Sequence, residues 1–180
     1  SDTYEVYWNI SIESLFNKMH SEYTKFWNKE RINKSNELKM SNIDVSILAS
    51  IVASETLKID EANTIAGVYI NRLKKNMYLQ ADPTLVYAAN DFSIKRVLNK
   101  HKKIASPYNT YINKGLPPGP IKLTTKEYID AVLNYEKHKY IYFCAKDDFS
   151  GYHVFAIKLS QHNRNAKKFQ KALNKRKIYR

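Results

Sequence analysis

Residues 41–55 constrain the fold more than any other part of the sequence, because they combine a helix start with a long apolar face. Ser41 and Asp44 have the spacing of a capping box, in which two side chains satisfy free backbone groups at a helix N-terminus. Apolar residues then recur at helical spacing, namely Ile47, Leu48, Ile51 and Val52. We therefore predict a helix that buries this stripe.

Glu55 continues the stripe, since helix geometry places it on the same face as Ile51 and Val52. A carboxyl group in that position is partly desolvated, which raises its pKa and suits it to donate a proton as a general acid. The alternative is a Glu at a helix end that bonds a nearby Lys or a backbone amide. Spacing alone leaves both interpretations open.

Further helices are predicted along the chain. Apolar residues at intervals of three and four predict one over residues 12–31. The other predicted helix starts are Asp60, Asp82 before Pro83, Ser93, a second capping box at 124–127, and Ser160. Between them, residues 106–120 hold four of the five prolines and predict a stiff, shaped loop.

Residues 140–157 predict a β-hairpin. Two runs of aromatic and β-branched residues, 140–145 and 152–157, flank the turn sequence 147–151. Alternation along the second run places His153, Phe155 and Ile157 on one face. The chain of 180 residues, 43% of them hydrophobic, is long enough for one sizeable core. We predict an α+β fold, mostly helical, with a small antiparallel sheet.

The net charge of +13 suits a polyanionic partner such as nucleic acid, anionic lipid or peptidoglycan. Residues 92–126 contain eight Lys or Arg and no acid, and residues 164–180 contain eight more. A solvated helix face is the simplest interpretation of the second group.

Several chemistries lack support in the sequence. Neither a P-loop nor a dinucleotide-binding glycine motif occurs, and no apolar stretch is long enough to span a membrane. The five histidines show no metal-ligand spacing with one another or with Cys144, and a lone Cys cannot form an internal disulfide. We expect Cys144 to be buried and inert.

Two polar clusters suit a carbohydrate groove. Residues 79–84 (LQADPT) could bond sugar hydroxyls, although Asp82 could equally be a helix cap and Gln80 a turn residue. In residues 106–111 (SPYNTY), Asn and Thr stand beside Tyr, and residues 115–120 (GLPPGP) follow. A wide structural turn is the alternative for this second cluster.

Ordered motifs make the sequence resemble the endolytic murein transglycosylases, the YceG-like or MltG family. Besides the two clusters above, the motifs are LASIVASET (48–56), AGVYINRL (66–73), YIYF (140–143), GYHVF (151–155) and SQHN (160–163). The resemblance implies that Glu55 is the catalytic residue, matching the family's Glu before Thr. Many relatives carry another Glu two positions earlier, where this chain has Ala53.

By this resemblance, the substrate is peptidoglycan and the bond is the β-1,4 link from N-acetylmuramic acid to N-acetylglucosamine. Glu55 would act first as acid and then as base, leaving a 1,6-anhydro end. We expect no metal and no cofactor, including the pyridoxal phosphate that an alternative label for relatives, aminodeoxychorismate lyase, would require. The candidates for binding the sugar are Gln80, Asp82, Thr84, Tyr108, Asn109, Thr110, His153 and Asn163.

Family members are typically anchored in the bacterial cytoplasmic membrane by an N-terminal helix, followed by a LysM-like subdomain. We therefore expect residues 1–40 to join such a region to a catalytic domain at 41–180 on the outer side of the membrane. A cell-wall synthase is an expected partner. The alternative functions are a non-catalytic peptidoglycan-binding module and a nucleic-acid-binding protein. The sequence contains no known nucleic-acid recognition motif that would support the second.

Overall fold

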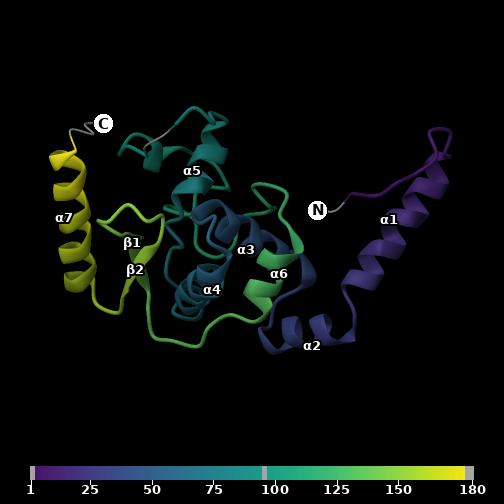
Figure 1. Ribbon diagram of the computed structural model, residues 1–180, viewed down its shortest axis with the longest axis horizontal. Helices are drawn as coiled ribbons and strands as arrows, with labels where there is room; N and C mark the ends of the chain where they lie inside the picture. Colours follow the sequence, from purple (N-terminus) through teal and green to yellow (C-terminus); the bar gives the residue numbers. More distant parts are fainter. Residues whose placement is uncertain (1–2, 95–96, 177–180) are drawn as a thin grey trace.

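The computed structural model describes residues 3–94 and 97–176, which form helices and one two-stranded antiparallel sheet (Figure 1). The elements are α1 Ile12–Phe26, α2 Lys29–Glu37, α3 Asn42–Glu55, α4 Ile59–Lys74, α5 Asp82–Ala89, the 3₁₀ helix η1 His101–Lys103, α6 Lys126–Leu133, β1 Tyr142–Ala145, β2 His153–Ala156 and α7 Leu159–Lys175. The predicted α+β class is confirmed.

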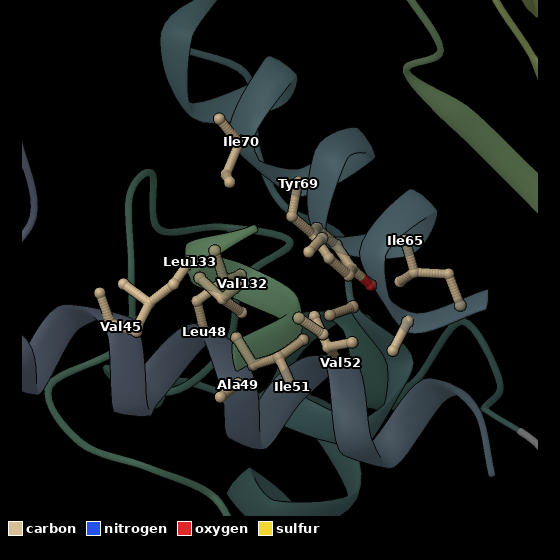
Figure 2. Close-up of a cluster of buried hydrophobic side chains, with 14 of the residues drawn as sticks. Val45, Leu48, Ala49, Ile51, Val52, Ile65, Tyr69, Ile70, Val132 and Leu133 are labelled. Carbon is tan, nitrogen blue, oxygen red and sulfur yellow. The ribbon is translucent and has the colours of Figure 1, made fainter. Parts of the chain in front are cut away.

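Helix α3 lies at the centre of the core. The predicted capping box is confirmed, because Ser41 Oγ accepts from the Asp44 N–H at 3.1 Å and Asp44 Oδ2 accepts from the Ser41 N–H at 2.9 Å. The helix is buried on more than the predicted stripe, since it packs against α4, α5 and α6. Figure 2 shows its apolar side chains meeting those of α4 and α6. Each fully buried Val, Leu or Ile contributes about 1.5–3 kcal/mol, so the end of α3 is held firmly.

The predicted hairpin is confirmed. Strands β1 and β2 are antiparallel, with Tyr142 paired to Ala156 and Ala145 paired to His153. Each strand has four residues and is shorter than the predicted run. Ile157 was predicted to share a face with Phe155. It lies beyond β2 and is 47% exposed, so it does not pack against the core as Phe155 does. Helix α7 packs on both strands.

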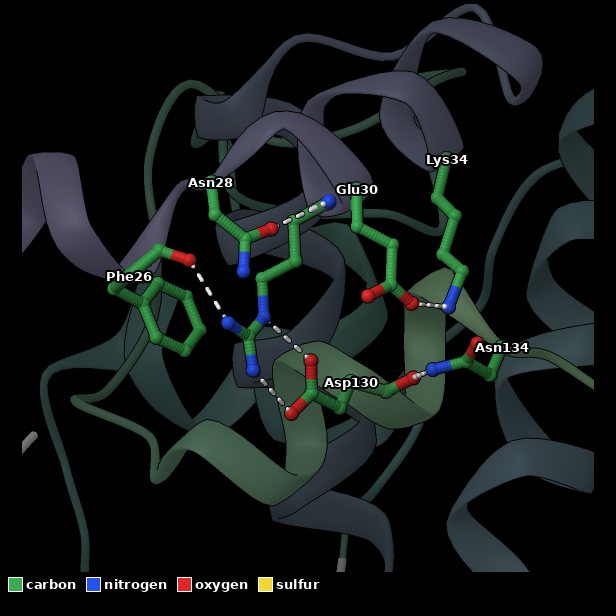
Figure 3. Close-up of polar contacts among 7 residues, drawn as sticks. Phe26, Asn28, Glu30, Lys34, Asp130 and Asn134 are labelled. Atoms are coloured by element: carbon green, nitrogen blue, oxygen red, sulfur yellow. Dashed lines mark hydrogen bonds and ion pairs between the residues drawn. The ribbon is translucent and has the colours of Figure 1, made fainter.

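The helix predicted over residues 12–31 is wrong as a single element. The chain turns at Trp27, which is buried in the core, and Asn28 then caps α2 by accepting from the Arg31 N–H. The Arg31 guanidinium makes two hydrogen bonds to the Asp130 carboxylate, at 2.8 and 2.9 Å, and so ties α2 to α6 (Figure 3). Helix α1 extends away from the central helices (Figure 1).

Four helices begin away from their predicted starts. Their N-caps are Lys58 for α4, Ala81 for α5, Thr125 for α6 and Lys158 for α7, and none of these residues makes a side-chain cap bond. Two of the predicted caps have tertiary partners instead: Asp60 accepts from the Tyr152 hydroxyl, and Asp82 accepts from the Tyr111 hydroxyl. Long-range hydrogen bonds have replaced local capping at these two acids.

The helix predicted to start at Ser93 is also wrong in the part that the structure describes. Ser93 bonds Asp91 Oδ1 through both its N–H and its hydroxyl, which forms a turn, and residues 97–100 are not helical. Residues 95–96 lie outside the described part of the chain.

Gly67 in α4 lies against the segment that follows α6. A Cβ atom on Gly67 would come within 2.5 Å of the Glu136 carbonyl oxygen and 2.6 Å of His138 Nε2. We expect Gly67→Ala to reduce the free energy of unfolding by about 1–3 kcal/mol, the usual cost of overpacking. Urea unfolding measures this, and an unchanged midpoint would show that this segment does not hold α4 in place.

Candidate active site

Two adjoining pockets share Glu55 and Asp82 in their walls. The larger pocket, of about 630 Å³, also includes Tyr87 and Lys122. The smaller, of about 420 Å³, is lined by residues of α4, the start of α5, the hairpin and the first turn of α7. Because both carboxyl groups belong to both pockets, they mark the place where the two pockets meet.

Glu55 is the last residue of α3, and its side chain bonds a buried tyrosine, not a lysine or a backbone amide. The Tyr69 hydroxyl donates to Glu55 Oε1 at 2.6 Å, and Tyr69 is only 1% exposed. Burial raises the pKa of Glu55 from its ordinary 4.5 to about 7, while the Tyr69 hydrogen bond lowers it, the Asp82 charge raises it and the Arg72 charge lowers it. At neutral pH, a substantial fraction of Glu55 is therefore protonated and can donate a proton.

Asp82, the first residue of α5, and Gln80, which precedes the helix, both line the smaller pocket. Asp82 is exposed, and its Oδ1 accepts from the Tyr111 hydroxyl at 2.5 Å. Burial, followed by the Asp82 contact, raises the pKa of Tyr111, so this hydroxyl keeps its proton and stays a donor. Gln80 has a left-handed backbone (φ 49°), and its N–H donates to the Thr110 carbonyl at 3.1 Å. This strained turn leaves the Gln80 side chain exposed in the pocket wall.

Arg72 joins the two sides of the smaller pocket. It is 7% exposed, and its guanidinium donates to the Leu79 carbonyl at 2.6 Å and to the Ile141 carbonyl at 2.7 Å. The first bond fixes the segment that carries Gln80, and the second fixes the approach to β1. Arg72 and Tyr69 lie three residues apart on α4, so one helix face supplies both the partner of Glu55 and this clamp.

A second buried acid contacts the hairpin. Glu61 in α4 accepts from the His153 N–H at 2.7 Å and lies 2.8 Å from His153 Nδ1. The two side chains are 7% and 13% exposed. His153 lines the same pocket as Glu55, as the sequence-based assignment to the site requires.

Five predicted sugar-binding residues do not line either pocket, and three of them are bonded inside the fold. Thr84, Asn109 and Thr110 are fully buried. Thr84 and Thr110 bond each other through their hydroxyls at 2.8 Å, and Asn109 bonds three backbone groups of the loop. Buried polar side chains need hydrogen-bond partners, and these three find theirs within the fold. Their bonds stabilise the loop. Tyr108 packs on Tyr87, and exposed Asn163 lies beside His162, which does line the pocket.

Sequence reasoning missed several residues that line the smaller pocket, namely Tyr69, Arg72, Tyr111, Tyr142, Cys144, Leu159 and His162. Helical spacing on α4 could have identified Tyr69 and Arg72 together. Cys144 is only partly buried, in contrast to the prediction, and burial raises the pKa of its thiol. Its proton is therefore retained at neutral pH, consistent with an unreactive thiol.

Neither a cluster of metal-ligating side chains nor a membrane-spanning helix occurs in the part of the chain that the structure describes. Residues 3–94 and 97–176 contain no group of three His, Cys, Asp or Glu side chains that could hold a metal ion. No helix among them is long and apolar enough to cross a membrane.

The sequence model of the YceG-like family matches residues 1–168. This chain belongs to the YceG-like family. It is 41% identical over 143 residues to an endolytic murein transglycosylase of Bacillus subtilis (strain 168), covering 78% of this chain and 39% of that protein. It is 32% identical over 170 residues to an endolytic murein transglycosylase of Streptococcus pneumoniae serotype 2, covering 91% and 30%. The chain thus spans less than half the length of these curated YceG-like relatives.

A solved YceG-like structure has the same fold. The crystal structure of a yceG-like protein from Listeria monocytogenes superimposes with a TM-score of 0.75 at 34% sequence identity, covering 91% of this chain and 52% of that one. The family fold therefore extends over most of the described elements.

Tyr69→Phe tests the hydrogen bond to Glu55. Because that bond lowers the pKa of Glu55, its loss should raise the pKa above 7 by about one unit, the equivalent of one net hydrogen bond. The side-chain carboxyl resonance of Glu55, followed by NMR against pH, measures the change. Tyr128→Phe is the matched control, since its hydroxyl donates to the Thr56 carbonyl beside Glu55. An unchanged or lower pKa in Tyr69→Phe would contradict the assigned role of Tyr69.

Proposed function

We propose that this chain is the catalytic portion of an endolytic peptidoglycan lytic transglycosylase. The observation that carries the proposal is Glu55, a carboxyl group with a pKa of about 7 at the junction of two pockets. The names of the Bacillus and Streptococcus relatives support the substrate class. The bond cut is the β-1,4 link from N-acetylmuramic acid to N-acetylglucosamine.

In the first step, protonated Glu55 gives its proton to the glycosidic oxygen. The bond from that oxygen to C1 of the muramic acid breaks, and N-acetylglucosamine leaves with a new hydroxyl. The C6 hydroxyl of the same muramic acid attacks C1 and closes a 1,6-anhydro ring. The proton of that hydroxyl returns to the Glu55 carboxylate, so the enzyme ends as it began and no water is consumed.

One carboxyl group suffices for this scheme because the nucleophile belongs to the substrate. An internal nucleophile reacts at a high effective concentration. Ordinary glycosidases lack such a nucleophile and use a second carboxylate, either to attack the sugar or to activate water. Asp82 supports Glu55 in two ways: its negative charge raises the pKa of Glu55, and it favours the positive charge that develops at C1. Gln80 bonds the sugar in this proposal, which its exposed position in the pocket wall supports.

The pockets on both sides of Glu55 favour an internal cut. An enzyme that cuts within a strand must hold sugars on both sides of the broken bond. The pockets of about 630 and 420 Å³ meet at Glu55 and Asp82, so sugars can occupy each side of the acid.

The architecture of the longer protein is part of the proposal. Residues 41–180 form the catalytic domain, and residues 1–40 join it to an anchored N-terminal region on the outer side of the cytoplasmic membrane. Helix α1 extends away from the catalytic core, while the Arg31–Asp130 ion pair fixes α2 to it. Cell-wall synthases are the proposed protein partners, because cutting a growing strand sets its length.

Asp82 favours one other function, that of a two-carboxylate glycosidase. A retaining or inverting hydrolase carries a second carboxylate near its acid, and Asp82 acts electrostatically on Glu55. Such an enzyme would add water and leave reducing ends instead of anhydro ends. A peptidoglycan-binding module would cut nothing, and a nucleic-acid binder would show steeply salt-dependent binding to DNA or RNA.

Glu55→Gln tests the proposal. The parent should digest purified glycan strands to fragments ending in anhydromuramic acid, identified by mass spectrometry. Gln cannot donate a proton as an acid, so we expect turnover to fall by about 10²–10⁴-fold, the usual contribution of general acid–base catalysis. Strand binding, measured by sedimentation with insoluble peptidoglycan, should change little.

Asp82→Asn is the companion variant that separates the two enzyme classes. For a transglycosylase, this variant should be slowed but should still leave anhydro ends. Reducing ends from the parent would identify a hydrolase, and strand binding without any cleavage would identify a binding module. Full activity of Glu55→Gln would show that Glu55 is not the acid.

A further inference from the structure

Glu61 and His153 form a buried acid–base pair that the scheme above does not use. The Glu61 carboxylate accepts from the His153 N–H through Oε1 and contacts Nδ1 through Oε2, at 2.7 and 2.8 Å. Both side chains are largely removed from solvent. Burial of a charged group costs several kcal/mol unless it is well paired. Because His153 also lines the pocket of about 420 Å³, the pair is a candidate functional group.

A purely structural role is the first explanation to consider. The neighbouring pair, Tyr152 and Asp60, also joins the hairpin to the first turn of α4, with the Tyr152 hydroxyl 2.9 Å from Asp60 Oδ2. Two adjacent links of this kind could simply fasten β2 to α4. They differ in position, however, since His153 lines the pocket that holds Glu55, whereas Tyr152 and Asp60 do not line it.

The contact between Glu61 Oε2 and Nδ1 fixes which ring nitrogen of His153 carries the proton in the neutral ring. A carboxylate can only accept a hydrogen bond, so Nδ1 carries the ring proton and its N–H donates a hydrogen bond to Oε2. In the neutral ring, Nε2 is then left as an acceptor, and no residue in the described ranges bonds it. The Phe143 ring packs edge-on against the His153 ring at 5.3 Å and holds its plane.

Phe143 also relates His153 to Glu55. The Tyr69 ring, whose hydroxyl bonds Glu55, packs edge-on against the same Phe143 ring at 5.8 Å. Phe143 therefore contacts both the His153 ring and the tyrosine that bonds Glu55. Glu55 and His153 both line the pocket of about 420 Å³. A sugar in this pocket can contact both groups.

We propose that His153, held by Glu61, accepts the proton of the attacking C6 hydroxyl and relays it to Glu55. This inference rests on the proposed transglycosylase reaction and names the route of its second proton. As the oxygen of the C6 hydroxyl forms its bond to C1, its proton passes to Nε2 of His153. Glu55, now a carboxylate, regains this proton through the water that enters the pocket once the product leaves, while the Glu61 carboxylate stabilises the transient imidazolium. Atoms and charge balance over the cycle, and the products are unchanged.

His153→Asn is the decisive variant. The Asn amide can still donate to Glu61 from near the position of Nδ1, but nothing replaces Nε2. We expect kcat to fall about 10²–10⁴-fold, the contribution of a general base, with KM nearly unchanged. In the residual reaction, water competes better with the poorly activated hydroxyl, so the share of reducing ends should rise. His153→Gln, which places a polar amide near Nε2 but no base, should stay as slow as His153→Asn.

Tyr152→Phe is the matched control, because it removes the adjacent link between the same strand and helix. It should keep kcat and the product ratio within about twofold of the parent, since a mainly exposed hydrogen bond contributes little. Thermal unfolding of both variants shows whether either one loosens the hairpin. Glu61→Gln should resemble a weaker His153→Asn, because it keeps an acceptor oxygen but loses the charge.

The outcomes separate this inference from the proposed function. If the parent yields no anhydro ends, the proposed function fails. If the parent yields them and His153→Asn matches its kcat and product ratio, the relay is overturned. Equal losses in His153→Asn and Tyr152→Phe would also overturn the relay, since fastening the hairpin would then explain both.

Discussion

The hydrogen bond between the Tyr69 hydroxyl and the Glu55 carboxyl is the contact on which the site depends. It joins the end of α3 to the middle of α4, the two helices that supply much of the core. A buried carboxylate is costly unless it is neutral or well bonded, so the fold keeps Glu55 near its protonation midpoint at neutral pH. The same α4 face carries Arg72, which fixes the walls on either side. One helix packing thus sets both the acid strength and the shape of the pocket.

This arrangement has a cost in stability. Glu55 has a folded-state pKa of about 7 against an ordinary value of 4.5. An acid whose pKa is raised by folding favours the folded state fully below its unfolded pKa, and that contribution is lost as pH rises through the folded pKa. Each unit corresponds to about 1.4 kcal/mol, so ionised Glu55 costs on the order of 3 kcal/mol before solvent screening at its partly exposed edge. A site that must keep an acid protonated therefore lowers stability at neutral and alkaline pH, a familiar conflict between activity and stability.

The sequence predicted the features that arise from local periodicity and failed where a distant partner decides. The capping box of α3 and the hairpin follow from neighbouring residues, and both are confirmed. The predicted caps Asp60 and Asp82 look like local signals, but tyrosines far along the chain bond them instead. Thr84 and Thr110 were likewise predicted as sugar contacts from the polar sequence around them. Their polarity serves a buried hydrogen bond between two loop segments, which no local pattern reveals.

Electrostatics at two length scales serve different purposes in this chain. The net charge of +13 acts over distances longer than a contact and attracts a polyanion, but salt screens it within about 8–10 Å. Inside the pocket the balance is local: the Asp82 charge raises the pKa of Glu55 and the Arg72 charge lowers it. A strongly basic surface alone would favour ionised Glu55. Burial and the Asp82 carboxylate raise its pKa to about 7, so even this strongly basic chain keeps a substantial fraction of the Glu55 carboxyl group neutral.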